Sequence, residues 1–334
     1  MDLINNEYNN KNSLNKVKSK YIVQQIFKNL SKIKLLEIIR YNKQLQSKLE
    51  IRITDYIRNF SKIIIEIIPE DNHYGNFINI KDENDSFFHI YFNDNKEEVM
   101  KTYINADDKV SKIKIIIDYG IKSLNKLFRN CICIKIINFI KFNISHINNM
   151  SYMFYGCSSL KELNLSHFSS KNVQGMIDMF GECSSLQYLN LSNLNTNKVN
   201  NMSWMFFGCS SIVELDLSHF NTDNVTNMRS MFSGCSLLTK LNVSNFNTNK
   251  VKDMSWMFCK CYNIHELDFS NFKTDNVNNM NRMFYKCWSL SKLIIPNFHI
   301  NNRTNVRHIF NNIPPNEIDI PEETLKRIQG IDMN

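Results

Sequence analysis

Residues 200–228, NNMSWMFFGCSSIVELDLSHFNTDNVTNM, end on nearly the letters with which they begin. Met202 and Met228 are 26 residues apart, and two other residue types keep the same interval without an insertion. They are Cys131, Cys157, Cys183, Cys209, Cys235, Cys261 and Cys287, and Phe128, Phe154, Phe180, Phe206, Phe232, Phe258, Phe284 and Phe310. A fixed period of roughly 20 to 50 residues is typical of a solenoid, in which each unit buries its apolar face by stacking on its neighbours.

One unit divides into three kinds of local structure. Leu160, Leu163 and Leu165 give L-x-x-L-x-L, whose last part alternates as a short strand does, and stacked strands predict a parallel sheet. Asn, Ser, Thr and Asp then cluster as they do in turns. One large apolar residue in each of these clusters is expected to fill the core beneath the turn, namely Phe168, Leu194, Phe220, Phe246, Phe272 and Phe298. Apolar residues from Val173 to Leu186 recur at intervals close to three, which predicts one face of a helix or of tight helical turns.

The recurring pattern M-x-x-M-F-x-G-C-S-S-L-x-x-L-x-L-S-x-F-x-T-x-x-V resembles a known repeat. It is similar to the 26-residue leucine-rich repeat of BspA-like surface proteins and mycoplasma lipoproteins, and it spans about residues 121–310. The resemblance implies a right-handed leucine-rich solenoid with a parallel sheet, used for binding and without enzymatic activity. The expected class is therefore α/β, with a small helical and β region before the solenoid.

The predicted organisation has four parts. Residues 1–20 are expected to be disordered, and residues 21–120 to form an N-terminal capping region with short helices in 21–51 followed by strands at KIIIEIIP, NFINI, FFHIYF and KIKIIID. The repeats follow in 121–310, and their first unit, CICIKIINFIKFNISHI, has the features of a capping repeat. Residues 311–334 are expected to close the far end with a helix between Pro321 and Gly330.

Composition limits the partners and the compartment. The net charge of +8 is spread along the chain, which favours a solvated surface over a nucleic-acid groove. The start MDLINNEYNN has no apolar signal-peptide core. The longest apolar segment, residues 131–140, is about half the length of a membrane span and contains a lysine. We therefore expect a cytoplasmic, monomeric protein without a membrane span. The cysteine column is expected to be buried filler in a reducing compartment, because 26 residues is no zinc-ligand spacing.

Function is expected where the repeats differ from one another. No catalytic motif occurs, so we expect no enzyme and no cofactor or metal. The Asn or Asp column of Asn164 and the serine column of Ser166 recur, which indicates turn caps. The outward column beside them varies, and we predict that it is a partner-binding strip, here called the strand-face strip: Tyr188, Glu214, Lys240, Glu266 and Lys292.

The sequence therefore predicts an intracellular protein-interaction scaffold whose ligand it does not identify. Two alternatives stay open. One is a surface adhesin whose export signal is not readable, and the other is an F-box-like substrate adaptor for ubiquitylation acting through residues 21–55.

Overall fold

The computed structural model describes residues 61–142, 146–168, 170–301 and 303–310, with residues 19, 21–22, 43, 47, 318–319 and 326. The chain divides into two units, Met1–Lys62 and Ile63–Asn334, and the second contains nearly all described residues. Four predictions fall outside the described residues: the disordered 1–20, the helices in 21–51, the F-box-like 21–55 and the helix between Pro321 and Gly330.

The second unit begins with a mainly antiparallel sheet. Strand β1 (Ile63–Pro69) pairs with β5 (Ile113–Ile117), which pairs with β3 (Phe88–Phe92), and both pairings are antiparallel. Alternate isoleucines of β1 and β5 are fully buried because successive side chains of a strand point to opposite faces. Three of the four predicted strands are confirmed, whereas NFINI contributes only Asn76 to the short pair β2 (Gly75–Asn76) and β4 (Tyr103–Ile104).

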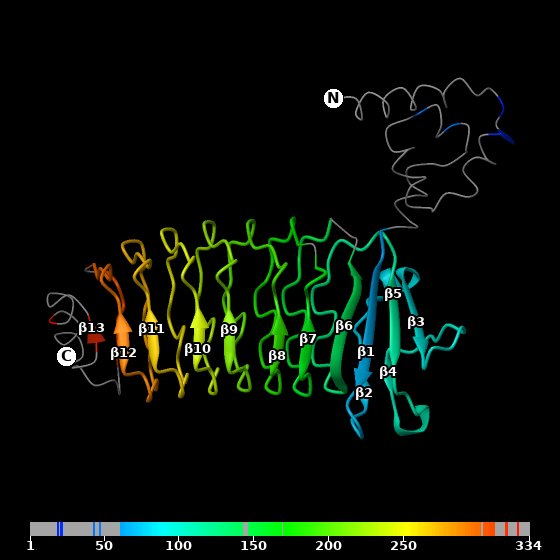
Figure 1. Cartoon of the computed structure of the whole chain (residues 1–334), viewed down its shortest axis with the longest axis horizontal. Coiled ribbons are helices and arrows are strands. Elements are labelled where there is room, and N and C mark those ends of the chain that lie inside the picture. The colour runs from blue at the N-terminus through cyan, green and yellow to red at the C-terminus, as the bar shows by residue number, and fades with distance from the viewer. Residues whose placement is uncertain are drawn as a thin grey trace, which may run out of the picture. The chain divides into compact units, whose positions relative to one another are not determined.

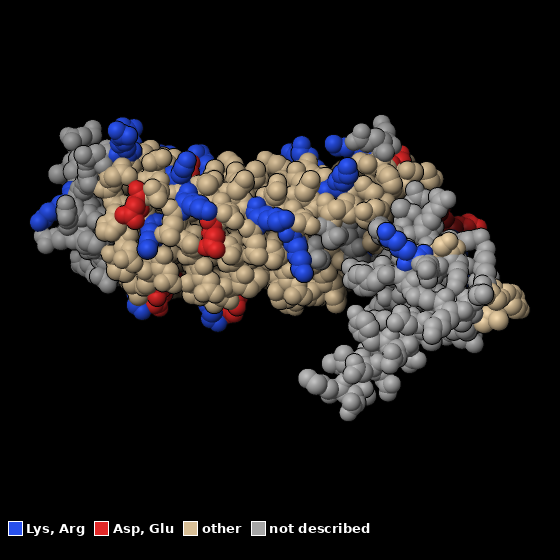
Figure 2. All heavy atoms as spheres, turned by 90° about the horizontal axis from the view of Figure 1, so that it is seen from above, with Lys and Arg blue, Asp and Glu red and all other residues tan. Residues whose placement is uncertain are grey.

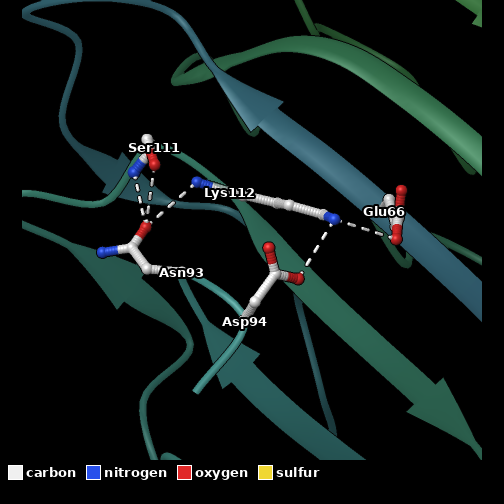
Figure 3. A network of polar contacts seen from close by, with 5 residues as sticks. All are labelled: Glu66, Asn93, Asp94, Ser111 and Lys112. Atoms are coloured by element: carbon white, nitrogen blue, oxygen red, sulfur yellow. Dashed lines mark hydrogen bonds and ion pairs between the residues drawn. The ribbon is translucent and has the colours of Figure 1, made fainter.

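A polar network ties these strands together (Figure 3). The side-chain oxygen of Asn93, just after β3, accepts hydrogen bonds from the amide N–H of Ser111 at 2.8 Å and of Lys112 at 3.2 Å. The ammonium of Lys112 lies 3.2 Å from a Glu66 oxygen on β1 and 3.1 Å from an Asp94 oxygen. Two short 3-10 helices complete this region, η1 (Asp82–Phe87) and η2 (Ala106–Asp108).

Strand β6 (Ile134–Phe142) joins the antiparallel sheet to the solenoid (Figure 1). It pairs antiparallel with β1 on one side and parallel with β7 on the other, giving the sheet order β3-β5-β1-β6-β7-β8. Its residues Ile134, Ile137, Phe139 and Phe142 are buried in the predicted register. Since β6 is paired on both sides, the first edge of the stack is not exposed, and the antiparallel sheet continues beyond it. The capping role of this first unit stays a prediction.

The repeats form a mostly β solenoid whose short strands stand side by side and point the same way (Figure 1). Its strands are β7 (Glu162–Asn164), β8 (Tyr188–Asn190), β9 (Glu214–Asp216), β10 (Lys240–Asn242), β11 (Glu266–Asp268), β12 (Lys292–Ile294) and β13 (Ile318–Asp319). Parallel pairing joins β7 to β8, β9 to β10, and β11 through β12 to β13. We call one 26-residue turn of this stack a rung.

A second line of parallel bridges connects the same rungs. It runs from Ser123 to Asn305 through one residue per rung, namely Asn149, Gly175, Asn201, Asn227, Asp253 and Asn279. In most of these rungs the Asn or Asp side chain also accepts the amide N–H two residues later, as Asn201 does from Ser203 at 2.9 Å. The predicted caps of the strand column follow the same geometry, with Asn164 accepting from Ser166 at 2.9 Å. Polar side chains thus complete the backbone hydrogen bonding on both lines.

Of the two local structures predicted for the apolar segment of each repeat, the described residues form tight turns and no helix. Residues 150–157 form two successive tight turns, in which Met153, Tyr155 and Cys157 donate to carbonyls three residues back. The amides between them donate to the next rung, as Met150 does to Gly175 and Phe154 to Met179. Two tight turns place Met and Phe inward at intervals close to three, so the apolar spacing of the sequence does not distinguish them from a helix. The observed fold is therefore mostly β.

Stacked side chains fill the interior. The phenylalanine column forms a continuous stack, with ring centroids of neighbours 5.3 to 5.8 Å apart and rings within 18° of parallel. The apolar residues under the polar turns, such as Phe220 and Phe246, are buried as predicted. The cysteine column is more than filler, because its six thiols from Cys157 to Cys287 each donate to the carbonyl of a phenylalanine 29 residues earlier, as Cys209 does to Phe180 at 3.1 Å.

Candidate interaction surfaces

The strand-face strip lies in register along the solenoid. All five of its residues are exposed, and Tyr188 is 54% exposed. Glu214 lies directly opposite Lys240, and Glu266 lies directly opposite Lys292. The structure thus brings the predicted residues into one column, while the β8 and β9 rungs are not joined by strand pairing.

The charges of this strip neutralise each other in pairs. Lys240 forms an ion pair with Glu214, and Lys292 with Glu266. All four side chains are more than half exposed, so each pair contributes at most about 1 kcal/mol to stability. The strip therefore has alternating but balanced charge, and Tyr188 supplies its large apolar surface. The fold does not depend on these charges, which leaves them available to a partner.

Charge is also mixed on the side seen in Figure 2, toward which the strand arrowheads of Figure 1 point. Lys and Arg lie singly along the solenoid with Asp and Glu among them, rather than in one continuous basic track. Lys198 and Lys250 of the loops after the strands donate to the side-chain oxygens of Asn172 at 2.7 Å and Asn224 at 3.0 Å. A continuous run of cations for a phosphate backbone is not visible on this side.

The two-turn segment of each rung forms a second surface, here called the turn face, which the sequence analysis did not find. Each rung holds two residues with left-handed backbone there, represented by Trp204 (φ 58) and Gly208 (φ 69). The first position is occupied by bulky residues such as Tyr152, Trp204 and Trp256, for which this conformation is costly. The inter-rung hydrogen bonds hold it, and the side chains project outward. The signal in the sequence was the variation on both sides of the recurrent Met-Phe pair.

Aromatic rings and cations alternate along the turn face. The guanidinium of Arg129 lies 5.2 Å from the ring centroid of Tyr155, that of Arg229 lies 5.8 Å from Trp204, and that of Arg282 lies 4.7 Å from Trp256. Such contacts stabilise a cation and fix the plane of its donors.

One acidic group interrupts this surface. Asp178 is partly buried, and one of its oxygens has no hydrogen-bond partner. Burial raises the pKa of Asp178 to about 7; the negative charge of Glu182 adds to the shift, and the positive charge of Arg129 opposes it. Asp178 and Glu182 thus form an acidic rung between Arg129 on one side and Arg229 on the other.

The cavities hold no complete catalytic arrangement among their described lining residues. A cavity of about 440 Å³ between the antiparallel sheet and the first rungs has Lys81 and Lys122 as its charged residues. A second, of about 410 Å³, contains Glu70 and His73. A hydrogen bond from Lys161 holds the pKa of Glu70 below its usual value, with the charge of Lys135 adding to the effect. Glu70 is therefore a fixed anion and is poorly suited to accept a proton.

Within the described part of the chain, no group of three His, Cys, Asp or Glu side chains is placed to share a metal ion. Among the described residues, no helix is long and apolar enough to cross a bilayer. The expectations of no metal and no enzymatic activity stay predictions.

A comparison with protein families gives one match. The profile of the family described as Mycoplasma protein of unknown function, DUF285, matches residues 122–215 and 207–322, together more than half of the chain. These limits coincide with the rungs described above. Comparison with curated proteins and with solved structures gave no match.

Proposed function

The chain belongs to the family described as Mycoplasma protein of unknown function, DUF285, and on that premise we propose that it is a non-enzymatic scaffold that binds a partner protein along the strand face of its solenoid. The repeat is assigned to the BspA-like variant of leucine-rich repeats, because its L-x-x-L-x-L letters build three-residue parallel strands with an inward central leucine.

The observation that carries this proposal is the contrast between neighbouring columns. The inward column of Leu163 is leucine in each rung from β7 to β12 and is largely buried. The outward column of Tyr188 changes from rung to rung, although its members lie in register and are exposed. Packing of the stack requires an apolar residue in the first column but places no such requirement on the second. The residue types of the second column can therefore be selected for contact with a ligand.

The dimensions of the strip fit a protein partner. Rungs of a parallel stack follow one another at about 4.8 Å, so five rungs from Tyr188 to Lys292 span about 20 Å, which is comparable with one side of a modest interface. Mixed charge around a tyrosine anchor is suited to a polar protein surface.

The experiment is affinity capture with the intact chain, identification of the bound protein by mass spectrometry, and titration of the purified pair. Replacing Tyr188 and Lys240 together with Ala is expected to weaken binding by about tenfold or more, with little change in melting temperature. The matched control replaces Tyr74 and Lys198 with Ala. These are an exposed tyrosine and an exposed lysine outside the strip, and the control is expected to bind the partner with wild-type affinity. Unchanged affinity in the Tyr188 and Lys240 variant would overturn the assignment of the strand face.

A further inference from the structure

Three cations converge on the turn face near the C-terminal end of the solenoid. Lys260 belongs to one rung, and Arg282 and Lys286 belong to the next, which is joined to it by a hydrogen bond from the Lys260 amide to the Tyr285 carbonyl at 2.8 Å. Their positive charges all act on Cys259, where they oppose the rise in the pKa of that thiol caused by its burial. The cluster is therefore a compact positive site.

Aromatic rings hold these cations in place. Arg282 lies 4.7 Å from the ring centroid of Trp256 and 5.8 Å from that of Tyr285, and the Lys286 ammonium lies 5.4 Å from the Tyr285 ring. Two rungs before Arg282, Arg229 lies over Trp204. Contact with an aromatic ring stabilises a guanidinium without using its N–H donors, which can still bind a carboxylate in a bidentate manner.

No carboxylate of the described chain balances this charge. Arg229, Lys260, Arg282 and Lys286, here called the basic patch, have no ion pair within 4.0 Å among the described residues, in contrast to the paired lysines of the strand-face strip. From Arg229 onward, the two residues before and the two residues after each Met-Phe pair contain no Asp or Glu. The nearby carboxylate of Asp253, on the line of bridges, accepts the amide N–H of Ser255 at 2.8 Å. One Nε atom, that of Arg229, is buried without a hydrogen-bond partner.

We propose that the basic patch docks a short acidic segment of a partner protein, which lies extended along the stack on the turn face. This inference rests on the proposed function only in that the ligand is a protein, and it places a second binding surface on the same rungs. Charge complementarity supports it, since carboxylates would supply the counter-charges that the described chain lacks.

The size of the patch limits the segment. Rungs advance by about 4.8 Å and an extended peptide by about 3.3 Å per residue, so the two steps from the rung of Arg229 to that of Arg282 take roughly four residues. Beyond the patch, toward the N-terminus, the segment would meet Asp178 and Glu182 and be repelled.

Two features favour an acidic peptide over single-stranded nucleic acid. Nucleic-acid binding of this kind combines a long basic groove with free aromatic faces on which bases stack. Here cations lie over the faces of Trp204, Trp256 and Tyr285, and the carboxylates of Asp178 and Glu182 end the positive surface.

The test is fluorescence anisotropy of the intact chain with labelled hexaglutamate, with hexaglutamine and six-nucleotide oligothymidylate as comparison probes. The variant is Arg282→Asn with Lys286→Asn. Both residues have left-handed backbone, φ 54 and φ 63, which Asn adopts more readily than most residues, so the charge is removed without harm to the turns. The matched control is Lys198→Asn with Lys250→Asn, which removes the same charge from exposed positions outside both surfaces.

Wild type is expected to bind hexaglutamate more tightly than either comparison probe, with an affinity that falls as salt rises. The Arg282 and Lys286 variant is expected to bind about tenfold more weakly or worse, at an unchanged melting temperature, and the control to bind as wild type. Equal weakening in both double variants would reduce the effect to net charge and overturn the proposal. Tighter binding of oligothymidylate would replace it with a nucleic-acid site.

The two binding surfaces fail separately. A wild-type protein that does not bind hexaglutamate, but binds its captured partner through Tyr188 and Lys240, would overturn the turn-face site and leave the proposed function intact. Conversely, binding of hexaglutamate through Arg282 and Lys286 would stand if the strand-face substitutions had no effect on a captured partner.

Discussion

The hydroxyl of Thr222 makes two hydrogen bonds to one residue of the next rung, donating to the carbonyl of Asn247 at 2.9 Å and accepting its amide N–H at 2.7 Å. The hydroxyl is almost fully buried, as are its counterparts one rung apart. Thr196, Thr248 and Thr274 repeat both bonds to the following rung. This column of hydroxyls thus joins the loops of successive rungs by hydrogen bonds outside the strand pairing.

Thr222→Val is expected to destabilise the protein by about 1–2 kcal/mol, because the amide and the carbonyl of the partly buried Asn247 both lose their partner while side-chain volume is kept. Thr222→Ser keeps the hydroxyl, as Ser170 does naturally in this column, and is expected to cost about 1 kcal/mol or less. Urea unfolding of the two variants measures the difference. Equal losses would show that packing, rather than the paired hydrogen bonds, accounts for the column.

Asp178→Asn is expected to change how stability depends on pH. The raised pKa of Asp178, about 7, means that the folded protein keeps a proton between about pH 4 and pH 7 that the unfolded chain has released. Stability contributed by this group is therefore full below about pH 4 and is lost as pH rises through 7. Asn at this position removes that slope and, after allowance for solvent screening, is expected to gain about 1–2 kcal/mol at pH 8.

The control for this experiment is Asp275→Asn, which removes the same charge from an exposed loop position. Its curve of unfolding free energy against pH is expected to keep the wild-type slope between pH 4 and pH 7. If Asp178→Asn also keeps that slope, the pKa of Asp178 is not raised in the folded protein.

The buried thiols are expected to react slowly with a thiol reagent in the native protein. Burial raises the pKa of Cys235 to about 12 and raises those of Cys183 and Cys209 well above the usual value, so almost no thiolate is present at pH 8. Cys259 lies beside three cations that oppose this rise and is expected to react before Cys235. Native-state labelling followed by mass spectrometry gives the order. Rapid modification of Cys235 in the native protein would contradict the burial of the cysteine column.

The melting temperature is expected to be the same with and without a chelator. A melting temperature that a chelator lowers would contradict the expectation that no metal is bound.

Removing one whole rung is expected to leave a folded, shorter solenoid. Deletion of residues 183–208 keeps every column in register, since Leu, Phe, Cys and Thr positions all repeat after 26 residues. Deletion of residues 183–195 shifts the following rungs by half a period and would place outward polar residues in the core. Circular dichroism and a single cooperative melt distinguish the two. Equal damage from both deletions would contradict independent stacking units.

Most of the fold could be predicted from the repeated sequence pattern. The uninterrupted interval gave the stack, the Leu163 column gave the strands, and the buried residues under the turns followed from their place among Asn, Ser and Thr. The register of β6 was also predictable, because Ile134, Ile137 and Phe139 keep the spacing of the later rungs. For the candidate site, the 26-residue interval was enough to predict that the residues of the strand-face strip lie in one column.

The sequence by itself determined the period and the identity of the buried columns, because apolar side chains at a fixed spacing have to be covered and only stacking covers them. The tertiary structure decided how the segment from Met150 to Cys157 is folded. Its amides donate alternately within the rung and to the neighbouring rung. The local sequence does not contain this second set of hydrogen bonds, because the acceptors lie one repeat away along the chain. For the same reason, only the structure placed Arg282 over Trp256 and brought Lys260 and Lys286 beside them, since charges far apart in sequence become neighbours only when rungs stack.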